Sequence, residues 1–135
     1  MKKVWKKHSF FTLSILVLLS AAMALSMIGC AKDNSLGEGE KAFTVEVYHE
    51  KGEVKTVEVK TDKKTVGDAL VEVGLIAGEN GPYGLMIKTV DGETHDSSVE
   101  NKYWAFYING EYAMSGVDST DVEVGAVYAF KVETF

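Results

Sequence analysis

The sequence has little cysteine, arginine or proline, and the scarcity of cysteine excludes one kind of stabilisation. Cys30 is the only cysteine, so the chain forms no internal disulfide. Arginine is absent, and proline occurs once, at Pro82. The 14 basic residues, all lysine, face 20 acidic residues, which gives a net charge of −6. A negative surface repels the phosphates of nucleic acids, and we expect no nucleic-acid partner.

Residues 1–29 have the pattern of a secretory signal peptide. Lysines 2, 3, 6 and 7 precede an uncharged stretch over residues 10–29, which ends in small residues. A basic start, an apolar stretch and a small-residue cleavage site are typical of such signals, although this stretch is also long enough for an uncleaved anchor. Cleavage would remove four lysines and leave 10 against 20 acidic residues, a net charge of −10.

Cys30 directly follows Met-Ile-Gly at 27–29, which resembles a bacterial lipobox. In a lipobox the cysteine is lipidated and becomes the first residue of the mature protein. A lone exported cysteine cannot pair internally, which favours lipidation over a free thiol. We therefore predict a lipid anchor on the extracytoplasmic face of the cell membrane, a flexible tether completing residues 30–42, and one domain over residues 43–135.

The first half of this domain shows strand and helix patterns in turn. Apolar and polar residues alternate over 43–48 and 56–60, on either side of a turn at 49–52. This pattern predicts a β-hairpin. A helix should follow, with Thr65 as its N-cap and Gly74 as its end.

The second half is organised around the aromatic run Tyr103–Ile108, which is apolar on both faces and predicts a strand inside a sheet. Asn109 and Gly110 both tolerate positive φ, as a type I′ turn requires, so the chain should reverse there. The other predicted segments are a loop over 77–84, a strand over 85–90, an irregular stretch over 93–102, a short return strand over 112–114, an acidic connection over 116–126 and a last strand over 127–132. One helix on a mixed sheet is an α+β fold, and the order of elements suits a β-grasp-like layer.

Several short motifs together resemble one family. They are Thr-Val-Gly-Asp-Ala-Leu at 65–70, Tyr-Gly at 83–84, Asp-Gly at 91–92, Tyr-Trp at 103–104, Ile-Asn-Gly-Glu-Tyr at 108–112 and Gly-Val-Asp at 116–118. In this combination, residues 43–133 resemble the stand-alone bacterial version of the transcobalamin C-terminal domain, the DUF4430 family. The resemblance implies a β-grasp-type ligand-binding fold.

The same resemblance implies a ligand class. In the vertebrate cobalamin carriers this domain closes over one face of the corrin ring, and a helical barrel supplies the rest of the site. The resemblance therefore suggests cobalamin or another corrinoid as ligand, approached by the turn at 112–117. It also implies a partner protein that completes the site, because the 135 residues contain no helical barrel.

The candidate ligand-binding residues lie on the aromatic run, in the turn that follows it and in a neighbouring loop. They are Tyr83, Tyr103, Trp104, Tyr107, Asn109, Tyr112, Met114, Ser115 and Val117. Aromatic rings can stack on a flat ligand, although core packing explains Trp104 and Tyr107 more simply. Tyr83 and residues 112–114 lie in or beside loops, which more often carry binding.

Two groups of residues are candidates for holding a metal. His95 lies near Asp91, Glu93 and Asp96, while His49 stands apart in the sequence. The carboxylates of Asp118, Asp121 and Glu123 are the alternative, because Ca²⁺ takes oxygen ligands. Neither spacing matches a known metal-binding loop.

No motif indicates catalysis. Nothing marks a serine or threonine partner for either histidine, and there is no glycine-rich phosphate loop. We therefore predict a non-enzyme without a certain cofactor. The leading hypothesis is a small-ligand-binding module, and the alternatives are a protein- or glycan-interaction module and a metal-binding surface protein.

Overall fold

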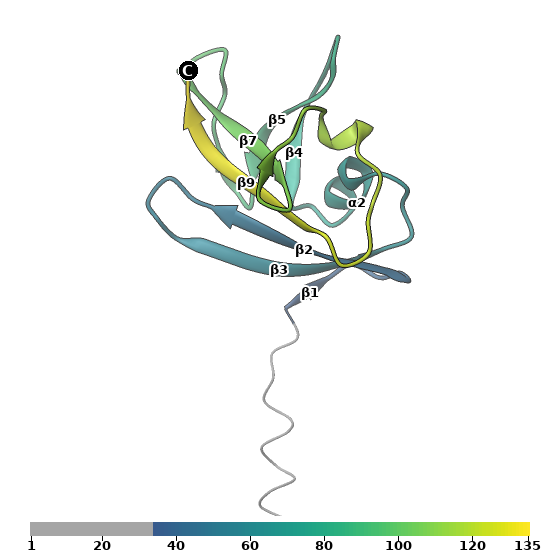
Figure 1. The fold of residues 1–135 in the computed structure, drawn as a ribbon. Helices are drawn as coiled ribbons and strands as arrows, with labels where there is room; N and C mark the ends of the chain where they lie inside the picture. Colours follow the sequence, from purple (N-terminus) through teal and green to yellow (C-terminus); the bar gives the residue numbers. More distant parts are fainter. Residues whose placement is uncertain (1–33) are drawn as a thin grey trace, which may run out of the picture. The chain divides into compact units, whose positions relative to one another are not determined.

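The computed structural model describes residues 34–135 and places them in two β-sheets and one short α-helix (Figure 1). The predicted signal peptide and Cys30 lie outside these residues. No helix within residues 34–135 is long and apolar enough to cross a membrane.

The larger sheet has six strands in the order β1-β3-β2-β9-β7-β8. Its strands are β1 (Ser35–Leu36), β2 (Lys41–Tyr48), β3 (Val54–Thr61), β7 (Lys102–Ile108), β8 (Glu111–Tyr112) and β9 (Val127–Thr134). The sheet is mixed, because β2 pairs with β9 in parallel and with β3 in antiparallel orientation. A mixed sheet with one helix is the predicted α+β architecture.

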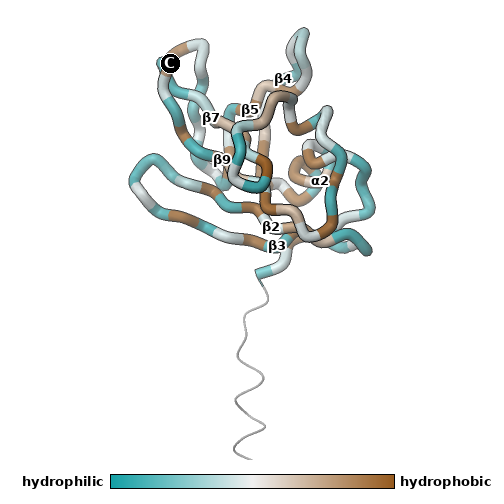
Figure 2. Tube along the Cα trace, viewed as in Figure 1, coloured by the Kyte–Doolittle hydropathy of each residue, from teal (hydrophilic) through white to brown (hydrophobic). Residues whose placement is uncertain are grey.

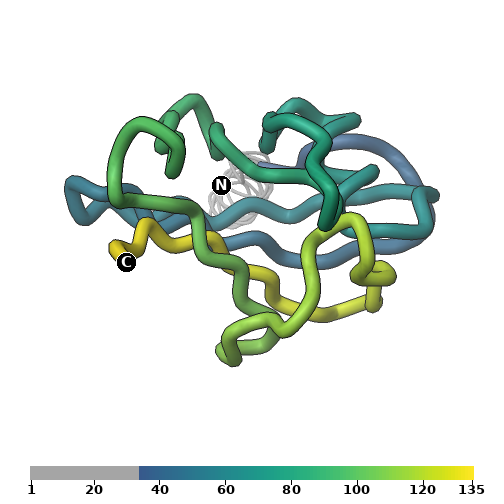
Figure 3. The backbone as a smooth tube through the Cα atoms, turned by 90° about the horizontal axis from the view of Figure 1, so that it is seen from above, coloured from purple at the N-terminus to yellow at the C-terminus, as the bar shows by residue number. Residues whose placement is uncertain are grey.

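The smaller sheet has three strands in the order β4-β5-β6. Its strands are β4 (Ile76–Gly81), β5 (Gly84–Val90) and β6 (Glu93–Thr94). The α-helix α2 spans Val66–Glu72, and a 3-10 helix, η2, spans Val117–Ser119. Seen from above, the part of the chain from α2 to β6 lies over β2 and β3 (Figure 3).

Local sequence rules explain both ends of α2. The Thr65 hydroxyl oxygen accepts a hydrogen bond of 3.2 Å from the backbone N–H of Asp68, as an N-cap does. At the other end, Gly74 has a φ of 72°, and its N–H donates to the carbonyl of Val71. The N–H of the next residue, Leu75, donates back to the last turn as well. This arrangement is a Schellman motif, and it confirms Gly74 as the predicted end.

One hydrophobic core joins the larger sheet to α2. Val45 of β2 and Leu70 of α2 are fully buried, as is Phe130 of β9. The ring of Phe106 stacks on those of Tyr128 and Phe130 at centroid distances of 5.9 and 5.3 Å. In Figure 2 the apolar brown segments meet where α2 faces the sheet, while the hairpin turns are hydrophilic.

The structure corrects the prediction of a loop over residues 77–84. Most of this segment belongs to β4, which pairs with β5. One of the glycines that suggest a loop is needed for close packing within the sheet. A Cβ atom on Gly78 would lie 1.9 Å from the carbonyl oxygen of Met86, so only glycine fits this bulged position.

β7 lies between β9 and β8, which confirms the predicted strand inside a sheet, although β8 pairs only with its last two residues. One further segment differs from expectation. Ser35 and Leu36, in the predicted tether, pair with β3 as β1. A short segment with little periodicity can still add to a sheet edge, since its backbone makes the hydrogen bonds.

Candidate functional site

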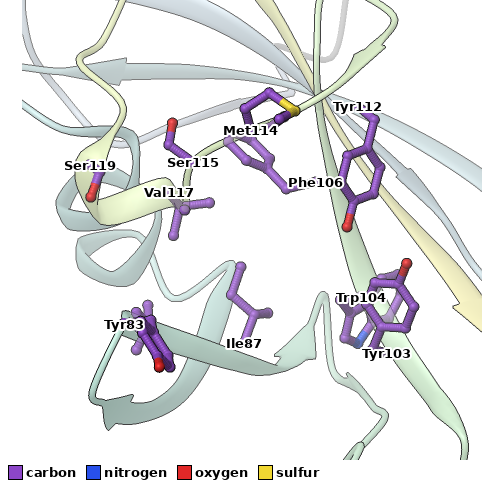
Figure 4. A pocket seen from close by; sticks show the side chains of 13 residues that line it. Tyr83, Ile87, Tyr103, Trp104, Phe106, Tyr112, Met114, Ser115, Val117 and Ser119 are labelled. Atoms are coloured by element: carbon purple, nitrogen blue, oxygen red, sulfur yellow. The ribbon is translucent and has the colours of Figure 1, made fainter. Parts of the chain in front are cut away.

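A cleft of about 570 Å³ opens between β5, β7 and the segment from Tyr112 to Ser119 (Figure 4). We call it the aromatic cleft. It is lined by Tyr83, Leu85, Ile87, Tyr103, Trp104, Phe106, Tyr112, Ala113, Met114, Ser115, Gly116, Val117 and Ser119. None of these residues is charged, although the whole chain carries a net charge of −6. The cleft is therefore suited to an uncharged or apolar surface.

The open edge of β7 forms one wall. On its side away from β9, β7 pairs with β8 only through Tyr107 and Ile108. Among the described residues, Lys102 to Ala105 therefore have no strand partner on that side. Trp104 and Phe106 lie at the base of the wall and are 5% and 8% exposed. The wall thus combines a buried apolar base with an unpaired strand edge.

A tyrosine pair stands at the top of this wall. The side chains of Tyr103 and Tyr112 point toward one another in Figure 4. The neighbouring Tyr112 hydroxyl, with burial and Glu133, raises the pKa of Tyr103 to about 12. The Tyr103 hydroxyl therefore stays protonated at neutral pH, and it donates a hydrogen bond of 3.3 Å to Glu133.

The turn after β7 fixes the position of Tyr112. Asn109 and Gly110 have φ values of 49° and 86°, which confirms the predicted two-residue turn. The Asn109 side-chain oxygen accepts a hydrogen bond of 2.9 Å from the backbone N–H of Val127. Asn109 thus attaches the hairpin to β9 and does not reach the cleft.

Three large side chains at the rim of the cleft face solvent. Tyr83 is 98% exposed, Met114 is 97% exposed and Tyr112 is 53% exposed. A single exposed apolar residue is ordinary. Three of them around one uncharged cleft form the kind of apolar surface that marks an interaction site.

Asp118 joins the other two walls of the cleft, which are β5 and the segment from Tyr112 to Ser119. Its carboxylate accepts a hydrogen bond of 3.1 Å from the backbone N–H of Leu85, which joins η2 to the start of β5. A Cβ atom on Gly84 would lie 2.5 Å from this carboxylate, so the contact requires glycine there. Within residues 34–135, Asp118, Asp121 and Glu123 do not converge as metal ligands.

Seven of the nine predicted ligand-binding residues line the aromatic cleft. The exceptions are Asn109 and Tyr107. The ring of Tyr107 packs edge-on against Tyr112 at 5.6 Å and lies beneath the Lys131 ammonium at 4.6 Å, so it supports the rim from behind. The prediction misses Leu85 and Ile87, which the alternating pattern of β5 places on one face.

A wider depression of about 850 Å³ lies between α2 and β4. Its lining includes several glycines and charged side chains and contains no aromatic ring. Leu85 borders both this depression and the cleft. The aromatic cleft is the better candidate for a small-molecule site, because such sites are lined mainly by hydrophobic and aromatic side chains.

A second group of side chains gathers where the β2–β3 turn meets the β5–β6 turn, beside a cavity of about 440 Å³. We call it the histidine–carboxylate cluster, and it consists of His49, Glu50, Asp91, Glu93, His95 and Glu100. The Glu93 carboxylate lies at its centre. One oxygen is 2.7 Å from His95 Nε2, and the other contacts His49 Nδ1.

Outer carboxylates complete the contacts of both rings. His49 Nε2 lies 3.0 Å from Asp91 Oδ2, and His95 Nδ1 lies 2.9 Å from Glu100 Oε1. Burial lowers the pKa of each histidine, but the hydrogen bonds to carboxylates outweigh it, and both pKa values are raised. Burial raises the pKa of Glu93, but its contacts with His95 and His49 lower it overall.

Trp104 joins the two sites. Its ring lies 5.5 Å from that of His95, and its indole N–H donates a hydrogen bond of 3.3 Å to the carbonyl of Glu93. The same residue lines the aromatic cleft. The sequence prediction brings His95, Glu93 and Asp91 together but misses Glu50, because that residue arrives from a hairpin turn 43 residues before Glu93.

The comparisons with known proteins agree with this description. A family model for a domain of unknown function, DUF4430, matches residues 63–134. The chain belongs to this family. No curated protein sequence matches it.

Two solved structures are similar to the DUF4430 domain. A proposed metal-binding protein from Ruminococcus gnavus ATCC 29149 matches with a TM-score of 0.67 and 35% identity, over 71% of this chain and 99% of that one. Haptocorrin in complex with Cbi matches with a TM-score of 0.52 and 17% identity, over 70% of this chain and 25% of that one. The second likeness shows the fold alone, and it confirms the predicted transcobalamin C-terminal-like α+β fold.

Proposed function

We propose that this DUF4430 protein is a lipid-anchored extracytoplasmic module that binds a small molecule in the aromatic cleft and performs no catalysis. The observation that carries the proposal is the nearly complete exposure of Tyr83 and Met114 at the rim of an uncharged cleft. Leaving large apolar side chains in water has a free-energy cost that a bound ligand or partner removes.

The lining favours a flat and largely uncharged ligand. The aromatic side chains of Tyr103, Trp104 and Tyr112 lie on one side, and Tyr83 and Ile87 lie across from them (Figure 4). A volume of about 570 Å³ lies in the range of small-molecule sites, roughly 300–1,000 Å³. The rim is open, so a second protein that covers the outer face of the ligand would complete the site.

A corrinoid is the first ligand to test. Haptocorrin, which shares the fold, is described in complex with Cbi. The corrin ring is flat and presents a broad face, which the aromatic lining can contact.

The proposal can be tested by titrating the full-length chain, in mild detergent, with cobalamin and cobinamide. Calorimetry and visible absorbance report the binding. We expect saturable binding that Met114→Ala weakens roughly tenfold, about 1.4 kcal/mol. Met86→Ala is the matched control, because Met86 is also an exposed methionine, 47% exposed, but does not line the cleft. Equal loss in both variants, or no heat at high ligand concentration, would reject corrinoid binding in this cleft.

The lipid anchor is a separate part of the proposal. Cys30 is the only cysteine, and it follows an apolar stretch directly. Cells that express the chain and are labelled with a fatty acid should incorporate label into the wild type and not into Cys30→Ser. Label in both proteins would show that Cys30 is not the attachment point.

Metal binding is a second candidate function. The relative from Ruminococcus gnavus, at 35% identity, is described as a proposed metal-binding protein. In this chain, Glu50, Glu93 and His95 bring potential ligand atoms within 4.8 Å of one another. Zinc titration of the full-length chain tests whether it binds a metal at all.

A further inference from the structure

We propose that Glu50, Glu93 and His95 bind one divalent transition-metal ion, with Zn²⁺ as the best fit. This inference rests on the second candidate function and adds which atoms bind the ion. Glu50 comes from the β2–β3 turn, Glu93 from β6, and His95 from the residue after β6. The site therefore ties together two turns that are distant in the sequence.

The spacing of the three side chains suits a small ion. His95 Nε2 lies 2.7 Å from Glu93 Oε1 and 3.8 Å from Glu50 Oε2. Zinc bonds to nitrogen and oxygen of about 2.0–2.2 Å place neighbouring ligands of a tetrahedral ion roughly 3.4 Å apart. One separation is shorter and one longer than this value. A small shift of Glu93 away from His95, and of the partly exposed Glu50 toward it, admits the ion.

His95 is already oriented as a ligand. Its side chain is 6% exposed, its backbone N–H donates to the carbonyl of Lys88 at 2.8 Å, and its ring packs against Trp104. Glu100 Oε1 lies 2.9 Å from Nδ1. A metal bound at Nε2 would replace the contact with Glu93 there, while Glu100 keeps the proton on Nδ1 and holds the ring in position.

The two carboxylate ligands are held in the same way. His49 Nδ1 contacts the Glu93 oxygen that faces away from His95. The Lys102 ammonium contacts Glu50 Oε1 and leaves Oε2 directed toward His95. Each of the three ligands thus has one outer partner and a second atom on the shared side, where His95 Nε2 and Glu93 Oε1 now contact each other.

The donor set and the charge indicate the class of ion. One imidazole and two carboxylates suit Zn²⁺ or Co²⁺, whereas Ca²⁺ requires six to eight oxygen ligands. Four carboxylates and two lysine ammonium groups meet in and around the cluster, so its net charge is −2 with neutral imidazoles. A divalent cation balances this charge, and water from the adjoining cavity fills its remaining positions.

Calorimetry on the full-length chain, freed of metal with a chelator, tests the site. We expect one Zn²⁺ per chain and much weaker binding of Ca²⁺. Glu50→Gln should reduce the zinc affinity at least about tenfold, and Glu100→Gln, which acts through His95, about tenfold. Glu53→Gln is the matched control, because Glu53 lines the same cavity but lies outside the ligand group.

Trp104 supplies a local readout of the same event. Bound Co²⁺ should quench its fluorescence, because its ring lies 5.5 Å from that of His95. Zn²⁺ should reverse the quenching by competition. In Trp104→Phe the quenched signal should be absent, since the remaining tryptophan is Trp5.

Two results would overturn the site, and they differ in meaning. Unchanged zinc affinity in Glu50→Gln and in His95→Gln, both shown to be folded by circular dichroism, would place the ion elsewhere and leave metal binding intact. No zinc binding by the wild type would reject the metal-binding function together with the site.

Discussion

The aromatic cleft and the histidine–carboxylate cluster meet at Trp104, yet they are built in opposite ways. The cleft leaves large apolar side chains in solvent, with Tyr83 and Met114 almost completely exposed. In the cluster, every histidine nitrogen has a carboxylate partner. The cleft therefore exposes apolar surface to water, whereas the polar groups of the cluster already have hydrogen-bond partners within the protein.

This difference separates the binding modes that we propose for the two regions. A ligand in the cleft covers apolar surface without displacing any protein contact, so the binding free energy comes from burial. An ion in the cluster must first replace the hydrogen bond between His95 and Glu93, so its affinity is reduced by the cost of that exchange. The proposed cleft ligand therefore needs no rearrangement of protein contacts, whereas the proposed ion requires the cluster to rearrange.

Phe130→Ala should have the largest effect, because it damages what both regions share. Phe130 is fully buried in β9 and stacks on Phe106 at 5.3 Å. Its truncation leaves a cavity, and we expect a loss of about 3–5 kcal/mol in the free energy of unfolding, measured by urea denaturation. Cobinamide and zinc binding should decline together. A loss below about 1 kcal/mol would contradict a shared core.

Asp118→Ala should have a smaller effect that is confined to the cleft. It removes the hydrogen bond from the backbone N–H of Leu85, which joins two walls. We expect a loss of about 1 kcal/mol of stability and weaker cobinamide binding, with zinc affinity unchanged. Asp118→Asn keeps an oxygen acceptor and is the control. Equal changes in both affinities would show that the two regions are not independent.

The pH dependence of the free energy of unfolding should reflect the histidine–carboxylate cluster and not the cleft. We expect this effect to be smaller than those of Phe130→Ala and Asp118→Ala. The pKa values of His49 and His95 are raised above 6.5, because hydrogen-bonded carboxylates outweigh burial. The folded state then holds more protons, so this stabilisation is fully present below about pH 6.5 and is lost as the pH rises through the raised values.

Urea midpoints measured in chelator across this pH range check the prediction. The wild type should lose stability as the pH rises, and His49→Gln should lose less. Met114→Ala is the control from the cleft and should follow the wild type. The same slope in His49→Gln and the wild type would contradict the assignment to the cluster.

Much of the fold follows from local rules in the sequence. Asn109-Gly110 determines the hairpin through its positive φ values, and Thr65 and Gly74 determine the ends of α2. β4 is not predictable in this way, because the glycine at 78 looks like a loop residue until the pairing with β5 shows why a side chain does not fit. Long-range pairing overrides local propensity there.

The residues of the candidate sites also differ in whether the sequence predicts them. The rim residues Tyr83, Tyr112 and Met114 follow from their place in loops beside an aromatic strand. Glu50 does not, because only the folded chain brings its turn to Glu93 and His95. Contacts between segments that lie far apart carry no periodic signal in a single sequence.

Fluorescence titration of Trp104 with cobinamide tests the central claim, that the aromatic cleft is the ligand site, most directly. Trp104 lies at the base of the cleft, and a bound corrin should quench it strongly. We predict saturable quenching whose midpoint moves to higher concentration in Met114→Ala and stays in place in Glu50→Gln. An absence of saturable quenching, or the same shift in both variants, would contradict the claim.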